Sequence, residues 1–268
     1  MRVQLNRFPG GLQKCLTLSY DDGKTADRRL AGIMDSNGVR GSFHLNSGFL
    51  GDATHITKEE IPMLFARHEV SVHTVTHPHL EYAPAEVIAR EILDDRKNLE
   101  DITGAPVRGM SYPFGTFNDI VLRMLPSLGI EYARTTVSHN GFSLPDDFLR
   151  WGATCHHKKD LLATTDRFIA EDPRGRLLLY YLWGHSYEFD NDNNWDLIES
   201  FCRKVGGRTD VWYATNIEIC DYMKAVRSLI FSADGTVVRN PSAKCVWIGV
   251  DARAVEVPGG AVIDLKSP

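Results

Sequence analysis

Short apolar runs alternate with amphipathic stretches along most of the chain. Residues 16–20 show the alternation of a strand, and residues 27–37 show a helical periodicity that Gly38 terminates. The expected strands are 16–20, 41–45, 69–75, 108–112, 130–135, 176–183 and 211–215, and the expected helices are 27–37, 58–67, 84–103, 118–128, 158–170, 194–205 and 217–229. A repeated strand-helix order predicts a parallel sheet covered by helices.

Two features favour an incomplete barrel over an open nucleotide-binding sheet. The nearly continuous apolar run 177–183 is typical of a strand buried on both faces. The first strand is followed by Asp21-Asp-Gly-Lys24, where a nucleotide-binding fold would carry a glycine-rich phosphate loop. We therefore expect an α/β fold, a distorted barrel, over residues 1–229.

The pattern changes near residue 230 to short alternating strands separated by turn residues. Turn signals lie at Ala233-Asp-Gly235 and Pro258-Gly-Gly260, between short runs of β-branched residues. The sequence predicts a small all-β appendage over 230–268, packed on the barrel.

Composition and charge indicate which binding partners and which cellular location to expect. Thirty Lys and Arg against 35 Asp and Glu give a formal charge of -5, the wrong sign for a nucleic-acid-binding surface. No apolar run approaches the roughly 20 residues of a membrane helix, and residues 1–10 lack the apolar stretch of a signal peptide. We expect a cytoplasmic protein with no nucleic-acid or membrane partner and five free cysteines. The oligomeric state stays open.

Unusual polar residues gather where the expected strands end. Asp21 and Asp22 follow the first strand, two histidines end the third, residues 111–115 close the fourth, and His185 follows the sixth. In an α/β barrel the carboxyl ends of the strands form the face on which active sites are built. We therefore expect these clusters to meet in one cleft.

The two histidines of the third strand indicate a metal site. His73 and His77 are four residues apart, which suits a shared ion if the backbone turns helically there. One carboxylate, Asp21 or Asp22, would complete a two-nitrogen, one-oxygen set with a position left for water, and the other could act as base. His185 would then be a candidate general acid. Each residue also has an ordinary interpretation, as a turn aspartate or as a solvated or core histidine.

At these positions the chain resembles the polysaccharide deacetylases, the NodB-homology group of carbohydrate esterases. The matching segments are Ser19-Tyr-Asp-Asp-Gly23, His73-Thr-Val-Thr-His77, Ser111-Tyr-Pro-Phe-Gly115 and, with one residue inserted, Leu182-Trp-Gly-His185. They occur in the family's order. The resemblance implies the family's distorted (β/α)7 barrel.

The resemblance also implies roles for the five polar residues. Asp22, His73 and His77 would hold a divalent metal, Asp21 would be the general base and His185 the general acid. A metal-bound water would attack an acetyl carbonyl. Zinc suits two imidazoles and one carboxylate best, although Co²⁺, Ni²⁺ or Mn²⁺ could occupy the same ligands.

Five further residues are expected at the substrate or the oxyanion. Tyr112, Pro113 and Phe114 belong to the third matching segment, and a backbone N–H near Phe114 would stabilise the oxyanion. Trp151 ends a loose stand-in for the family's fourth motif, and it is either a wall of the acyl pocket or a packed loop aromatic. Trp183, two residues before His185, completes the set.

Three regions depart from the family pattern or remain open. Ser111 stands where the family has the arginine that orients the base, so Arg134 or Arg150 is expected to take that role. Cys155-His-His157 could bind a metal but is expected to be a polar loop. Residues 188–195 are either a rim that contacts sugar or the cap of the next helix.

Together these features predict a metal-dependent hydrolase that removes acetyl groups from an N-acetylated or O-acetylated sugar or oligosaccharide. Two alternatives remain: a hydrolase of a non-sugar amide on the same fold, and an inactive carbohydrate-binding relative.

Overall fold

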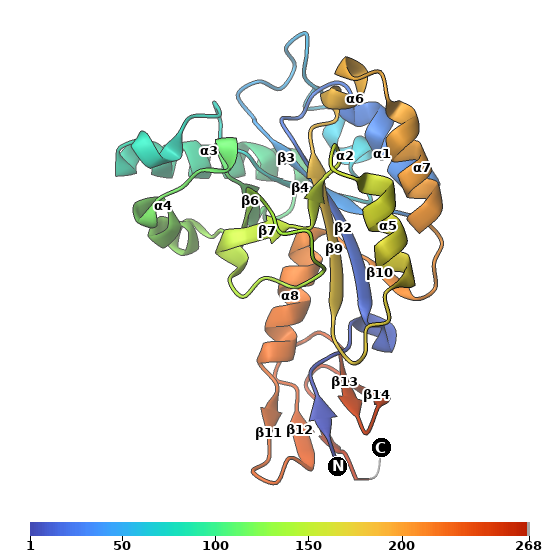
Figure 1. The fold of residues 1–268 in the computed structure, drawn as a ribbon. Coiled ribbons are helices and arrows are strands. Elements are labelled where there is room, and N and C mark those ends of the chain that lie inside the picture. Colours follow the sequence, from blue (N-terminus) through green and yellow to red (C-terminus); the bar gives the residue numbers. More distant parts are fainter. Residues whose placement is uncertain (267–268) are drawn as a thin grey trace.

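A parallel sheet that curls into a distorted barrel forms the centre of the molecule. The computed structural model describes residues 1–266. Nine parallel strands belong to this sheet: β2 (Lys14–Asp21), β3 (Gly41–Leu45), β4 (Glu69–Val72), β5 (Gly109–Ser111), β6 (Tyr132–Ser138), β7 (Trp151–Ala153), β8 (Cys155–His156), β9 (Leu178–Gly184) and β10 (Val211–Tyr213). Their order is β7-β6-β5-β4-β3-β2-β9-β8, with β10 beside β2 (Figure 1).

One segment closes the barrel. Its first half, β7, pairs with β6, and its second half, β8, pairs with β9. Between them, the Thr154 N–H donates to the Tyr181 carbonyl at 2.8 Å. Counting β7 and β8 as one strand, a circle of seven runs from β2 through β6 to β9, which confirms the expected barrel.

Helices cover the outside of the barrel. They are α1 (Asp27–Ser36), α2 (Ile61–Leu64), α3 (Ala85–Thr103), α4 (Asp119–Met124), α5 (Leu161–Ala170), α6 (Tyr187–Asn191), α7 (Trp195–Val205) and α8 (Asn216–Arg227). Short 3-10 turns are η1 (Pro9–Gly11), η2 (Leu80–Tyr82), η3 (Pro113–Gly115), η4 (Leu125–Leu128) and η5 (Phe148–Arg150). Within residues 1–266 no helix combines the length and the apolar character that crossing a membrane requires.

Four elements differ from the sequence prediction. The helix expected at 58–67 is the single turn α2, and the strand expected at 69–75 ends at Val72. The seventh barrel strand is 151–156, which is too short for periodicity to reveal. The expected strand 211–215 exists as β10, but it pairs only with the first half of β2.

Strand β2 shows how the barrel separates apolar from polar side chains. Leu16, Leu18 and Tyr20 pack into the cluster under the helices. The intervening Thr17 and Ser19 are also buried but form hydrogen bonds, because alternate side chains of a strand point to opposite faces. The barrel therefore has a hydrogen-bonded polar interior that ends at Asp21.

A half-buried carboxyl lies at the start of β4. Glu69, the first residue of β4, accepts hydrogen bonds from the Tyr132 hydroxyl at 2.7 Å, the Ser42 hydroxyl at 2.6 Å and the Ile217 N–H at 2.9 Å. Burial nevertheless raises the pKa of Glu69 from 4.5 to about 7. Glu69 is among the residues that line a cavity of about 570 Å³.

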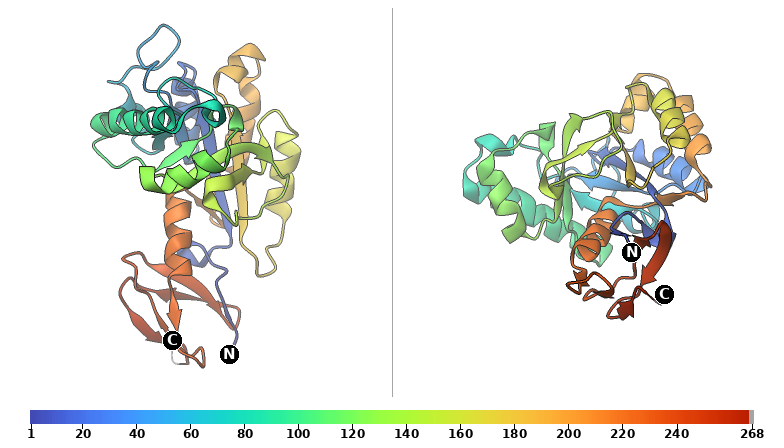
Figure 2. Two further views of the ribbon diagram at one scale, coloured as in Figure 1. Left: turned by 90° about the vertical axis from the view of Figure 1, so that its left-hand side faces the viewer. Right: turned by 60° about the horizontal axis from the view of Figure 1, so that its bottom comes forward.

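The C-terminal strands form two small antiparallel sheets below the barrel (Figure 2). One contains β1 (Val3–Gln4), β13 (Val246–Val250) and β14 (Arg253–Val257), and the other contains β11 (Ile230–Phe231), β12 (Val237–Arg239) and β15 (Val262–Asp264). Their buried valines and isoleucine share a cluster with the side chains of α8. The N-terminal strand thus joins strands from the other end of the chain.

Glu69→Gln should make stability less dependent on pH. A carboxyl with a higher pKa in the folded chain takes up a proton on folding, so stability is highest below pH 4.5 and is lost as pH rises through about 7. We expect this group to cost the wild-type protein about 3 kcal/mol of unfolding free energy between about pH 4 and pH 8, and the variant to escape that cost. Urea unfolding across this range measures it, with exposed Glu86→Gln as the control. Parallel curves for wild type and Glu69→Gln would contradict the assignment.

Candidate active site

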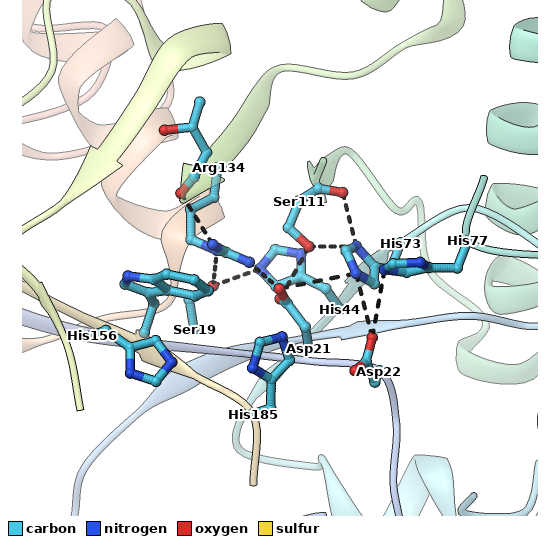
Figure 3. A network of polar contacts seen from close by, with 12 residues as sticks. Ser19, Asp21, Asp22, His44, His73, His77, Ser111, Arg134, His156 and His185 are labelled. Atoms are coloured by element: carbon cyan, nitrogen blue, oxygen red, sulfur yellow. Dashed lines mark hydrogen bonds and ion pairs between the residues drawn. The ribbon is translucent and has the colours of Figure 1, made fainter. Parts of the chain in front are cut away.

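The polar residues expected at the strand ends come together at one end of the barrel (Figure 3). Asp21 ends β2 and Asp22 follows it, while His73 and His77 lie in the loop after β4. Ser111 ends β5 and His185 follows β9. Parallel strands bring these segments together because their carboxyl ends share one face of the barrel.

Asp22, His73 and His77 form a compact set of donor atoms. The Asp22 Oδ1 atom lies 3.5 Å from His73 Nε2 and 3.8 Å from His77 Nε2. The three ligand atoms all lie within 4.8 Å of one another. Two nitrogens and one oxygen this close together could hold one divalent ion.

The hydrogen bonds of His73 fit such an ion. Its Nδ1–H donates to the Ser111 carbonyl at 2.9 Å, which assigns the ring proton to Nδ1 and leaves the Nε2 lone pair facing Asp22. Metal-bound histidines typically donate their second ring N–H in this way. The donor set therefore fits a zinc-like cation.

The backbone at the site is not helical, contrary to the turn that the histidine spacing suggested. Asp22, Thr74 and His77 have positive φ values of 82°, 68° and 56°. The Thr74 hydroxyl accepts the His77 N–H at 3.0 Å and holds the irregular turn. These left-handed residues bring both imidazoles to the same carboxylate, and backbone strain of this kind is concentrated at functional sites.

Two buried residues that the sequence analysis missed support the His73 loop. The Asn46 side-chain amide donates to the carbonyls of His73 and Thr74 at 2.5 and 3.0 Å. The Asp95 carboxyl accepts the N–H groups of Ser47 and His73 at 2.8 and 3.0 Å. Burial raises the pKa of Asp95 to about 7. Neither residue lies in a family motif, so only the tertiary structure identifies them.

Arg134 holds Asp21, the carboxylate next to the donor set. The Arg134 guanidinium forms a buried ion pair with Asp21 Oδ2, and the Ser111 hydroxyl donates to Oδ1 at 3.0 Å. Burial raises the pKa of Asp21, but Arg134 and then His73 outweigh burial and hold it far below 3.8. Arg150, the other candidate, is exposed and lies 3.8 Å from Asp147. The structure therefore selects Arg134 as the arginine that replaces the one missing at Ser111.

The predicted aromatic residues occupy different environments. The Trp183 ring lies 4.4 Å from the Arg134 guanidinium and so lines the pocket of the ion pair. Trp151 is fully buried, in contact with Tyr132 and Tyr181, as the packed aromatic that the sequence also allowed.

Pro113 and Tyr112 are also buried, and the Tyr112 hydroxyl donates to the Leu149 carbonyl at 2.8 Å. Phe114 is half exposed with a φ of 59°, and its ring packs edge-on against His77. Of these three residues of the third matching segment, Phe114 alone presents its side chain to solvent beside the donor set.

His185 is oriented by a carboxylate three residues later. Its Nδ1 lies 3.2 Å from Glu188 Oε2, at the start of α6. Burial lowers the pKa of His185, but the hydrogen bond to Glu188 and the charges of Asp21 and Asp22 raise it by more, so its pKa lies above 6.5. Glu188 is a residue that the sequence analysis placed only on a rim or a helix cap.

A second group of potential ligands surrounds Glu188. His156 Nε2 and His157 Nε2 lie 3.1 and 3.4 Å from Glu188 Oε2, and Lys158 Nζ lies 3.2 Å from Oε1. The Lys158 backbone N–H donates to His156 Nδ1, so the ring proton of His156 is on Nε2 and points at Glu188. These side chains therefore surround Glu188 with positive and polar groups. The prediction of a polar loop at Cys155-His-His157 is wrong, because Cys155–His156 forms strand β8 and both Cys155 and His157 are buried.

An open cavity of about 480 Å³ adjoins the donor set. Its lining includes Asp22 and His77 together with Lys24 of the β2–α1 loop and polar side chains of the β3–α2 loop, among them Asp52 and Thr54. Hydroxyl, amine and carboxylate groups beside the donor atoms suit a polar, neutral substrate.

Comparisons with known proteins agree with the motifs. Residues 10–133 match the family model of polysaccharide deacetylases. YxkH of Bacillus subtilis strain 168, which carries the same family name, is 24% identical over 127 residues, 46% of this chain and 45% of YxkH. A chitin deacetylase of Pestalotiopsis is 27% identical over 131 residues, 48% of this chain and 44% of that protein. The chain thus matches less than half the length of these relatives.

A solved structure shows the same fold over most of the chain. A Mycobacterium smegmatis structure described under the same family name superposes with a TM-score of 0.62 at 17% identity, covering 85% of this chain and 96% of that chain. This likeness establishes the barrel, and the family model confirms the resemblance seen in the motifs.

Arg134→Gln should destabilise the protein far more than Arg150→Gln. The first change leaves Asp21 buried without its cation, which typically costs about 3–5 kcal/mol, whereas an exposed arginine contributes within about 0.5 kcal/mol. Urea unfolding of both variants at one pH measures the difference. Equal losses would show that the buried ion pair is not the support of Asp21.

Proposed function

We propose that this chain, whose residues 10–133 belong to the polysaccharide deacetylase family, is a metal-dependent hydrolase that removes acetyl groups from an acetylated carbohydrate. The observation that carries the proposal is the Asp22, His73 and His77 donor set beside an ionised Asp21. The name of the chitin deacetylase relative favours an N-acetylated sugar, so the scissile bond is an amide. A divalent ion at this donor set, zinc in first place, would supply Lewis-acid activation of water and of the acyl carbonyl.

Asp21 is suited to accept a proton from the attacking water. Its ion pair with Arg134 holds the pKa of Asp21 well below the usual range of a carboxyl, so Asp21 is ionised at neutral pH. A carboxylate with such a low pKa is a weak base, and so it works only on a water that has been made acidic. The Arg134 contact therefore supports the proposal of a metal, alongside the donor set.

Two other groups complete the reaction. The Phe114 backbone N–H would donate to the oxygen of the acetyl carbonyl as negative charge develops on it. His185, with its Nδ1–H held by Glu188, presents Nε2 to the leaving group. As the new C–O bond forms and the C–N bond breaks, the water's proton passes to Asp21 and the His185 proton to the amine, giving acetate and a free amino sugar.

Asp21→Asn should keep the metal and lose turnover, whereas His73→Ala should lose both. The first change removes only the proton acceptor, which typically costs about 10²–10⁴-fold in rate, and the second removes a ligand. Metal content by plasma mass spectrometry and acetate release from N-acetylglucosamine oligomers and acetylated xylan are the measurements. His156→Ala is the matched control, because we place that imidazole outside the metal site and expect it to keep the ion.

The same assay separates the alternatives. Hydrolysis of small amides without any hydrolysis of acetylated sugars would favour a non-sugar substrate. Bound metal with no hydrolysis of any amide or ester would defeat the enzyme proposal. A near-normal rate for Asp21→Asn would overturn the role of Asp21 as base.

Glu188→Gln should move the basic limb of the pH-rate profile to lower pH. His185 must be protonated to act as acid, so activity falls as pH rises through its pKa, and Glu188 raises that pKa. Removing the negative charge lowers the pKa and brings the loss of activity to lower pH. The profile of kcat for wild type and variant measures the change, and an unmoved basic limb would show that Glu188 does not act through His185.

A further inference from the structure

The polar interior of the barrel contains a histidine that the proposed reaction does not use. His44 lies in β3, its side chain is fully buried, and it stands opposite Asp21 in the register of β2 and β3. Its backbone carbonyl accepts the Asp22 N–H at 3.0 Å. Burying an imidazole is costly unless its polar atoms form hydrogen bonds, so the contacts of the ring indicate its purpose.

The ring of His44 contacts the serine that supports Arg134 (Figure 3). The Ser19 Oγ atom lies 2.8 Å from His44 Nε2. The same Oγ atom accepts the Arg134 Nε–H at 3.1 Å. A hydroxyl that accepts through a lone pair still has one proton to donate, and the Nε2 lone pair of His44 is an acceptor for it. Ser19 therefore stands between an imidazole acceptor and a guanidinium donor.

Three of the nitrogens of Arg134 are held by different partners. Its Nε–H donates to Ser19, its Nη1 group donates to the Thr135 carbonyl at 3.0 Å, and its Nη2 group pairs with Asp21. Because the guanidinium is planar, contacts at separate nitrogens fix its plane as well as its position. The contact to Ser19 depends on a hydroxyl that can rotate, and an acceptor for the hydroxyl proton sets the direction of its lone pairs.

We propose that His44 is a positioning residue for the reaction: by accepting the Ser19 hydroxyl proton at Nε2, it directs a Ser19 lone pair at Arg134 and so holds Asp21 in line with the attacking water. The inference rests on the proposed function, because it takes Asp21 as the base. The chain of contacts runs from His44 through Ser19 and Arg134 to Asp21, and all four side chains are buried. It requires the neutral imidazole that carries its proton on Nδ1.

His44→Phe and His44→Gln form a matched pair that tests this chain. Phenylalanine fills the space of the imidazole but offers no acceptor, whereas the side-chain oxygen of glutamine can accept the Ser19 proton. We expect His44→Phe to lower kcat about 10- to 100-fold, with KM for N-acetylglucosamine oligomers and metal content unchanged, because a base that is slightly displaced loses its alignment. His44→Gln should recover most of that loss.

Two further variants show whether the effect passes through Ser19. Ser19→Ala/His44→Phe should be no slower than Ser19→Ala by more than about twofold, because both changes break the same link. Thr17→Val is the control: it removes an equally buried hydroxyl two residues earlier in β2, one that donates to Asn216 instead, and it should keep kcat. Losses that multiply in the double variant, or equal losses in kcat for His44→Phe and His44→Gln, would overturn the inference.

Nuclear magnetic resonance tests the same chain without turnover. In ¹H–¹⁵N spectra of the wild-type protein we expect His44 to carry its proton on Nδ1, and we expect His44→Phe to move the Arg134 Nε–H signal as Ser19→Ala does. A proton on Nε2, or an unmoved Arg134 signal, would overturn the inference even if the protein releases acetate. Failure of the wild-type protein to release acetate from any substrate would instead overturn the proposed function, and the expected spectra would still support the positioning of Arg134 by His44.

Discussion

The buried ion pair between Arg134 and Asp21 determines how the rest of the site is arranged. It crosses the barrel interior from β6 to β2, and burying two charges is tolerable only if their remaining donors and acceptors are satisfied. Arg134 therefore also donates to the Ser19 hydroxyl and lies over Trp183, while Asp21 accepts from Ser111. Ser111 also contacts His73 through its carbonyl, so the ion pair and the Asp22, His73 and His77 donor set belong to one network of polar contacts.

The positions of the donor-set side chains depend on strained backbone conformations that the rest of the barrel holds in place. Asp22, His77 and Phe114 all have left-handed backbone conformations, each of which costs a non-glycine residue about 1–3 kcal/mol. Rigid strands and buried supports such as Asn46 and Asp95 hold them there. The consequence is that the Asp22 carboxylate, the two imidazoles and the Phe114 backbone are held in place before any substrate binds.

The sequence contained enough information for the barrel and for the polar clusters, but not for the contacts between them. Apolar strands followed by aspartate or histidine are local patterns, so β2, β4 and β9 and the residues after them were predictable. The choice of Arg134 over Arg150 depends on which side chain enters the barrel, and that is a tertiary fact. Glu188 becomes a partner of His185 only because α6 begins immediately after that histidine. The closing strand at 151–156 is too short to have a period, and the exposure of Phe114 cannot be read from residue type.

The barrel has two seams that differ in their number of paired residues, and each seam supports a different part of the candidate active site. Along one seam, β2 and β9 are joined by seven consecutive residue pairs. Along the other, a single segment of six residues bridges β6 to β9, with only two paired positions on each side. Local opening needs fewer broken hydrogen bonds at this second seam than between β2 and β9. Such an opening would loosen β8 and its histidines beside Glu188, while β2 and β3 stay joined by four paired positions. If His185 is the acid and Asp22 helps to hold an ion, as proposed, barrel breathing at this seam would interrupt leaving-group protonation before it released the ion.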